Sequence, residues 1–351
     1  MTALPAYRVL ADGTDVTDRI ASRNSAIEIA YLNDGEGGVL TLVFDDSPEP
    51  PFEPGRPPRS DGINLPRHGV ALSVLVQEPE GGFGTMGKFI VDEVELTAPP
   101  RRLVVRARSA DLRGNLKERK RRHWDQTTLG AIVQRLAAEH ELKAGVAPVL
   151  ATVPVPYIAQ LDESDLGFLR RLGRRHDALA TIANGMMLLI PRGLGMTASG
   201  KIMPAIEVPA HRVRSVRVLF DDQRRFGGIR ARAYDARLAR SVERGTSATG
   251  PVGVLRDRHV DPTDAVRAVR ATEGTLARAE QTLALEMKGD ARVNVGSVIT
   301  LTGFRDGVEG TWSVTAVRHR IDGDGYQLEL RAELTTERAR EEKAKQAQGT
   351  S

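Results

Sequence analysis

Two glycine-rich stretches come closest to the motifs that hold phosphate groups. The first, at residues 82–87, has the GxGxxG spacing of a dinucleotide-binding turn. That chemistry requires a strand before the turn and a helix after it, so that the phosphates meet the N–H groups at a helix N-terminus. Residues 88–96 instead alternate apolar and polar side chains as a strand does, so we predict a hairpin loop at these glycines.

The second stretch, at residues 195–201, follows the spacing of a phosphate-binding loop up to its final position. Ile202 occupies the position at which a serine or threonine hydroxyl would bind the magnesium ion. Pro204 blocks the helix that such a loop requires next. We therefore predict a turn that has no phosphate chemistry.

The remaining residues that could do chemistry form no catalytic or metal-binding set. His140 and His176 end predicted helices, where a cation supports the helix dipole, and no HExxH pattern occurs. The adjacent aspartates at 45–46 and 221–222 close strands and are typical turn formers. The absence of cysteine excludes disulfides and thiolate metal sites. The sequence predicts a protein that is not an enzyme and has no cofactor or metal ion.

Length and charge describe a soluble protein of two or three domains. The chain has 351 residues, 40% of them hydrophobic, and its 50 basic and 46 acidic residues give a net charge of +4. No apolar run reaches the roughly 20 residues that span a bilayer, so we expect no membrane insertion. The N-terminus lacks the basic and apolar regions of a secretory signal. We therefore expect the chain to fold in the cytoplasm of the cell that makes it.

The basic excess is local. Residues 101–125 hold ten Lys or Arg against three acids. Aromatic side chains are not interleaved with these cations, which favours a solvated loop or a subunit contact over a nucleic-acid site. A nucleic-acid-binding protein that uses the basic stretches 101–125 and 211–245 remains the alternative function.

The periodicity of apolar residues divides the chain into β, α and β regions. Short alternating segments with turn signals predict an antiparallel sheet or small barrel first, and similar segments return after a helical stretch. The seven prolines in residues 47–69 exclude regular structure there. Residues 1–110 are predicted as a first β domain, 111–200 as an α/β insertion, 201–335 as a second β domain and 336–351 as a charged flexible tail, either a frayed helix or a disordered segment.

Two helices are predicted from apolar stripes and caps. One covers residues 128–143, with Asp125 or Thr127 as its N-cap. The other is long, about 262–288, with Asp261 as its cap and a proline in its first turn. Both are expected to bury one apolar face against a sheet.

The helix with the most consistent signals lies within residues 158–178, after an extended proline-bearing link at 146–157. Ser164 can cap it, acidic residues crowd its start, and four arginines lie toward its end. Its apolar face is formed by Leu166, Leu169 and Leu172. Alone, these signals predict a surface helix.

Four segments of the chain, in order, resemble the late control protein D family of contractile phage tails. They begin at residue 89, at Trp124, at Gln160 and at residue 303, and together they span most of the chain. The residues that carry the resemblance are Asp92, Glu93, Asp111, Trp124, Leu129, Gln160, Glu163, Ser164, Asp165, Phe168, Leu169, His176, Gly310, Trp312 and His319.

The resemblance implies a structural baseplate hub of a phage tail or tail-like particle. The implied fold is α+β and mainly β: two tail-tube-like antiparallel β-barrels with an inserted helical α/β domain, similar to the N-terminal part of VgrG. Such hubs form a homotrimeric ring that joins the six-fold tail tube to the three-fold spike. The implied partners are therefore the chain itself, the tail tube protein, the central spike protein and other baseplate proteins, and the implied location is the virion baseplate.

The resemblance assigns the fifteen residues structural roles and no catalytic one. The chain lacks the β-helical repeats of a spike and an added cell-wall hydrolase domain, so we expect separate proteins to supply them. The particle type stays open between a phage, a bacteriocin-like tail and an injection system. The role of residues 47–69 also stays open.

Overall fold

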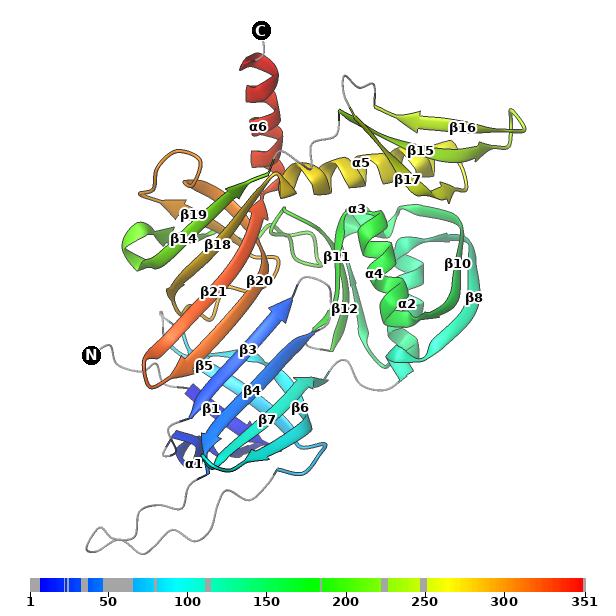
Figure 1. Ribbon diagram of the computed structural model, residues 1–351. Helices are drawn as coiled ribbons and strands as arrows, with labels where there is room; N and C mark the ends of the chain where they lie inside the picture. The colour runs from blue at the N-terminus through cyan, green and yellow to red at the C-terminus, as the bar shows by residue number, and fades with distance from the viewer. Residues whose placement is uncertain are drawn as a thin grey trace, which may run out of the picture.

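The computed structural model describes residues 7–349 apart from 22, 24, 33–36, 47–65, 79–80, 111–114, 184, 222–226 and 247–250. Most of the proline-rich loop predicted at 47–69, and Asp111, lie outside the described residues. Figure 1 shows two β regions that follow one another in one large sheet, with the helical insertion to one side. The mainly β, α+β architecture is thus confirmed.

The first β region is built from strands whose apolar residues alternate. In one of them, Leu40, Leu42 and Phe44 all face the core, while the residues between them are more exposed. The elements are β1 (Tyr7–Ala11), β2 (Thr14–Asp15), α1 (Thr17–Ala21), β3 (Ala26–Leu32), β4 (Gly38–Asp45), β5 (Ala71–Gln77), β6 (Phe83–Thr97) and β7 (Arg102–Ser109).

The second β region has its own core, centred on the fully buried Trp312. Its strands are β13 (Ile206–Pro209), β14 (Val213–Phe220), β18 (Gln281–Lys288), β19 (Val298–Thr302), β20 (Gly310–Asp322) and β21 (Gly325–Leu334). Strand β20 pairs antiparallel with β3, so the two regions share one sheet. Tyr31 on β3 contacts both cores. The sheet branches at β20, which pairs with β3, β21 and β19, and β19 pairs in turn with β13.

The insertion surrounds a third core. The long strands β8 (Arg119–Thr128) and β10 (Pro154–Ser164) pair with each other, and the helices α2 (Leu129–Glu139) and α4 (Asp165–Arg175) pack beside them. The smaller elements are η2 (Asn115–Lys117), β9 (Lys143–Val146), α3 (Pro148–Ala151), β11 (Ala178–Ala183) and β12 (Met186–Pro191). The rings of Trp124 and Phe168 stack with centroids 6.0 Å apart and tie β8 to α4.

A fourth, smaller unit joins the insertion to the second β region. Helix α5 (Pro262–Ala279) covers one face of a sheet made of β15 (Gly228–Asp235), β16 (Arg240–Gly245) and β17 (Val252–His259). Figure 1 shows this sheet beside α5, away from the large sheet, and helix α6 (Thr336–Gly349) projecting from the top of the second β region. A 3₁₀ turn, η3 (Ala210–Arg212), leads into β14.

The predicted long helix at 262–288 was wrong in its last third. Asp261 caps α5 as predicted, accepting a hydrogen bond from the N–H of Asp264 at 2.8 Å. The helix ends at Ala279, and residues 281–288 form strand β18 instead. Leu283 and Met287 fit the apolar stripe of a helix, but Leu285 is buried as well. Burial of every second residue is the pattern of a strand.

Other boundaries also needed correction. Thr128 caps α2, with Asp125 and Thr127 in β8, and the helix ends at Glu139 rather than at residue 143. The basic stretch 101–125 is not a loop, since most of its described residues lie in β7 and β8. The link at 146–157 contains α3 and the start of β10, and the segment 158–164 is strand, so that α4 begins after Ser164.

The two glycine-rich stretches and the C-terminal segment differ in how well the predictions describe them. The glycines at 82–87 lie mostly inside β6 rather than in a loop, because the turn precedes Phe83. Residues 195–201 do form a turn, closed by a hydrogen bond from the Thr197 N–H to the Lys201 carbonyl at 2.8 Å. The predicted flexible tail is helix α6, whose base is buried through Ala339.

Candidate functional site

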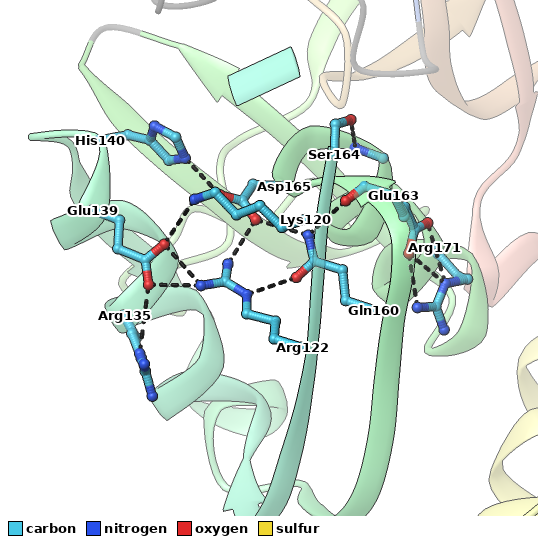
Figure 2. A network of polar contacts seen from close by, with 11 residues as sticks. Lys120, Arg122, Arg135, Glu139, His140, Gln160, Glu163, Ser164, Asp165 and Arg171 are labelled. Carbon is cyan, nitrogen blue, oxygen red and sulfur yellow. Dashed lines mark hydrogen bonds and ion pairs between the residues drawn. The ribbon is translucent and has the colours of Figure 1, made fainter. Parts of the chain in front are cut away.

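The Asp165 carboxylate lies at the centre of the insertion's largest polar cluster, where the chain passes from β10 into α4. Its side chain is 0% exposed. It accepts hydrogen bonds from Lys120 Nζ at 2.6 Å, Arg122 Nη2 at 2.6 Å and Gln160 Nε2 at 2.8 Å, and His140 Nε2 lies 2.8 Å away. Figure 2 shows these side chains converging on Asp165 from β8, β10 and the end of α2.

A second carboxylate completes the cluster. Glu139, at the end of α2, accepts from Lys120 Nζ at 3.0 Å and from Arg122 Nη1 at 2.7 and 2.8 Å. Arg122 also lies over the Trp124 ring, with its guanidinium carbon 4.7 Å from the ring centroid. Two cations thus bridge two carboxylates that belong to different helices, which fixes α2 relative to α4.

Burial and hydrogen bonding have opposite effects on the protonation of this cluster. Burial disfavours the charged form of Asp165, but hydrogen bonds from Gln160, Lys120 and His140 outweigh it and hold the pKa of Asp165 below its ordinary value. Lys120 responds in the complementary way, since its contacts with Asp165 and Glu139 raise its pKa despite burial. Both groups stay charged at neutral pH, so the cluster acts as a brace and not as an acid–base pair.

The neighbouring residues position Asp165. Ser164 caps α4 by accepting a hydrogen bond from the Gly167 N–H at 3.1 Å. Gln160 is fully buried, and its amide also donates to the Glu163 carbonyl at 2.9 Å across a bulge in β10. Glu163 binds Arg171 of α4 through contacts of 2.8 to 3.2 Å. The acids at the start of the predicted helix therefore have separate structural partners.

A second cluster joins the insertion to the second β region. Arg278 of α5, only 1% exposed, donates to Asp177 Oδ2 at 2.8 Å and also contacts Asp177 Oδ1. Its Nε donates to Glu333 of β21 at 3.1 Å. Asp177 follows α4 directly and also accepts from Thr275 at 3.0 Å. One buried guanidinium therefore connects the insertion, α5 and the large sheet.

A third cluster joins α4 to the start of α5. Asp264 contacts the Arg175 guanidinium and lies 3.0 Å from His259 Nδ1. Burial opposes the charge on Asp264, but the contacts with His259 and Arg175 prevail and lower its pKa to about 2. Asp264 is therefore ionised at neutral pH.

Arg338, which the sequence placed in the flexible tail, is buried at the base of α6. Its guanidinium lies over the ring of Trp312, 4.5 Å from the ring centroid, and donates to the Gly307 carbonyl at 3.1 Å. Trp312 in turn donates from Nε1 to the Val308 carbonyl at 2.8 Å. A Cβ at Gly310, whose φ is +113°, would meet Arg338 Nη1 at 3.0 Å. Gly310 and Trp312, both named in the resemblance, thus lie against the same guanidinium group.

Replacing Gly310 with alanine is expected to cost about 1–3 kcal/mol of unfolding free energy, from backbone strain and the contact with Arg338. Gly325→Ala is the matched control because its φ is +116° and nothing lies within 4 Å of its Cβ position. Denaturant unfolding of both variants separates the two causes. Equal losses would show that Arg338 does not require glycine at 310.

His319 lies where the two β regions meet. Its Nδ1 is 2.9 Å from the Tyr326 hydroxyl, and its ring packs edge-on against Tyr31 with centroids 6.4 Å apart. The hydroxyl of Tyr31 in turn donates to the Met86 carbonyl. Burial lowers the pKa of His319 to about 4, so the imidazole is neutral at neutral pH.

Stability is expected to fall as the pH drops from about 6.5 toward 4. In that window the unfolded chain binds a proton at His319 that the folded chain excludes, which costs up to about 3 kcal/mol. Burial also lowers the pKa of His176 to about 4, which adds a loss of the same sign. His319→Gln should flatten the dependence of the melting temperature on pH, whereas His123→Gln on the exposed face of β8 should leave it unchanged. An unaltered slope in His319→Gln would contradict this assignment.

The other residues of the resemblance fall into two groups. Asp92 pairs with Arg108 at 2.7 Å, and Glu93 contacts Arg106, both on the exposed face of β6 and β7. The buried group consists of Trp124, Leu129, Phe168, Leu169, Trp312 and His319. His176 is the C-cap of α4. The structure thus gathers Gln160, Ser164 and Asp165 around one cluster and leaves Asp92 and Glu93 elsewhere.

Sequence reasoning missed the cations. Lys120 and Arg122 fell in a stretch predicted as a solvated loop or a subunit contact, and Arg278 was not singled out. The available signal was the alternation of cations along β8, which places Lys120 and Arg122 on one face of a strand. Among the described residues, no group of three or more acids and histidines has the arrangement of a metal site, and no helix has the length and apolarity needed to cross a membrane.

Comparison with known proteins decides what this arrangement belongs to. The family model described as phage tail baseplate hub (GPD) matches residues 83–325, which include the insertion and helix α5. The chain belongs to this baseplate hub family. Its function as a structural hub of a contractile phage tail, and its location in the tail baseplate, follow from that membership.

The hub's relatives agree with this assignment. It is 27% identical to the probable baseplate hub protein of Escherichia phage P2, over 95% of the hub and 94% of that protein. The 43 kDa tail protein of prophage MuSo2 from Shewanella oneidensis shares the fold with a TM-score of 0.68 and 13% identity, over 94% of the hub and 99% of that chain. A component of the type VI secretion system of E. coli matches with a TM-score of 0.53 and 10% identity, over 94% of the hub and 74% of that chain. The expected likeness to VgrG-type proteins is thus confirmed at the level of fold.

Proposed function

We propose that the hub forms a homotrimeric ring that joins a six-fold tail tube to a three-fold spike. The observation that supports this is the presence of two β regions, each with its own core, joined through the pairing of β3 with β20. Three copies with two β regions each would present six comparable positions to the tube. The same three copies would present a three-fold arrangement to the spike.

The ring would be held by a heterologous interface, because a surface of one copy that binds a different surface of the next closes after three steps. The two β regions of one copy cannot shift freely past each other, since six residues of β20 pair with β3. Buried charge clusters fix the insertion to this frame. The proposed role is mechanical: the hub holds the spike at the tip of the tube, bears axial load and takes part in no catalysis.

The mass of the purified hub, alone and mixed with tube and spike proteins, tests this proposal. We expect a species of three times the chain mass that captures both partners, with three-fold symmetry in electron micrographs. A persistent monomer that captures neither protein would overturn the ring. Clearing of peptidoglycan by the pure hub in a zymogram would overturn the purely mechanical role.

The contacts within the basic stretch 101–125 favour the structural role over nucleic-acid binding. Several of its cations face carboxylates of the chain itself, and phosphate binding would have to displace these partners. The cations concerned are Arg106, Lys120, Arg121 and Arg122. We expect no DNA binding by the hub at moderate salt in a salt titration.

A further inference from the structure

The small sheet beside α5 leaves one of its faces uncovered by the described chain. We call residues 228–246 and 251–259, which contain β15, β16 and β17, the arginine arm. Its inner face is apolar and packs on Ala265 and Val269 of α5 through Ile229, Ala231 and Ala233. Figure 1 shows the β15–β16 hairpin extending past the end of α5 and away from the large sheet.

The outer face of the arm carries arginines aligned across neighbouring strands. Arg232 is paired in register with Arg258 on β17 and with Glu243 on β16. The side chains of Arg230, Arg232 and Glu243 are 49%, 59% and 50% exposed. Glu243 lies 3.2 Å from Arg232 and 3.9 Å from Arg230, so a single carboxylate serves two guanidinium groups. The face keeps an excess of positive charge.

Large apolar side chains lie among these arginines. Tyr234 is 54% exposed, Leu238 in the β15–β16 turn 52% and Val254 on β17 52%. Tyrosine and arginine are enriched in protein interfaces and among the residues that contribute most to binding, whereas lysine is depleted. The arm contains seven arginines and no lysine. Its composition is that of a protein-binding surface.

The charge of the chain favours a partner other than a second copy. The arm holds seven arginines and three acids, a net charge of +4, which equals the net charge of the whole chain. The rest of the hub carries 43 basic and 43 acidic residues and is therefore neutral. A neutral surface offers no excess of negative charge to the arm, whereas a different, acidic protein does.

We propose that the arginine arm docks onto a carboxylate-rich surface of another protein of the particle. Guanidinium groups on the outer face would bind carboxylates in pairs, and Tyr234 and Leu238 would fill an apolar recess beside them. A nucleic acid fits less well, because it would leave these two side chains exposed and would approach the carboxylate of Glu243. The inference does not depend on the trimeric ring.

The chemistry of the arm is tested with two polyanions, poly-L-glutamate and duplex DNA, by fluorescence anisotropy in 150 mM salt. Arg230→Gln combined with Arg232→Gln should weaken poly-L-glutamate binding about tenfold. Arg106→Gln with Arg108→Gln is the matched control, since these side chains are similarly exposed, also pair with carboxylates and lie on β7. Tighter binding of DNA than of poly-L-glutamate, or equal losses in both variants, would overturn the proposal.

The occupant is identified with a photo-crosslinking amino acid at Leu238 in assembled tail particles. We expect an adduct between the hub and a different protein, at a segment rich in Asp and Glu. An adduct with a second hub, with nucleic acid, or with a segment that lacks carboxylates would overturn the proposal, and so would the absence of any adduct. Failure of the ring would show separately, in the mass of the wild-type hub.

Discussion

Asp165→Asn is expected to lower the free energy of unfolding by about 3 kcal/mol, the cost of leaving buried cations without their counter-charge. The amide keeps the size of the carboxylate, but its NH₂ group would replace an acceptor oxygen in front of Lys120 and Arg122. Both cations now lie 2.6 Å from Asp165. Guanidinium unfolding measures the loss, and hydrogen exchange should show faster opening of α2 and α4 than of the large sheet.

The matched control is Asp162→Asn, three residues earlier. Asp162 pairs with Arg121 at 2.7 Å, but both side chains are more than half exposed, so the loss should be far smaller than that of Asp165→Asn. Asparagine also tolerates the positive φ of 49° at this position. Comparable losses in the two variants would show that burial of the Asp165 cluster contributes nothing to the insertion.

Local signals predicted the start of helices well, because a cap and its helix are neighbours in sequence. Ser164 and Asp261 both cap the helices assigned to them. The predictions failed where a short run of apolar residues fits the spacing of a helix and of a strand equally well. Residues 281–288 are such a run. Residues 281–288 form a strand because they pair with β14 on one side and with β21 on the other. These partners are distant along the chain, so the local sequence does not reveal the pairing.

The polar clusters were harder to predict for a related reason. Lys120 and Asp165 are 45 residues apart, and Arg278 and Asp177 are 101 residues apart. Each residue alone reads as a solvated charge, and only the fold brings the partners together. The family resemblance found Asp165, Gln160 and Ser164 but not the cations that neutralise the carboxylate. The same limitation concealed Arg338, which became a core residue only because α6 docks on Trp312.

Arg278→Met is expected to destabilise the hub by about 3–5 kcal/mol, because it leaves Asp177 and Glu333 facing each other without a cation between them. The methionine side chain fills much of the same volume, so the loss reports on charge rather than on a cavity. Denaturant unfolding gives the size of the effect. Hydrogen exchange should rise at the start of β11 and at the end of β21, where the insertion meets the large sheet.

Arg318→Met provides the control, since Arg318 also lies between two carboxylates, Glu28 at 3.2 Å and Glu329 at 3.5 Å, but is 51% exposed. Its loss should stay below about 1 kcal/mol. Combining Arg278→Met with Asp177→Asn should cost less than the sum of the two single changes, because the second substitution removes the carboxylate that the first left unpaired. Additive losses would mean that the two residues are not coupled. The pairing of Arg278 with Asp177 would then not be what holds the insertion to the large sheet.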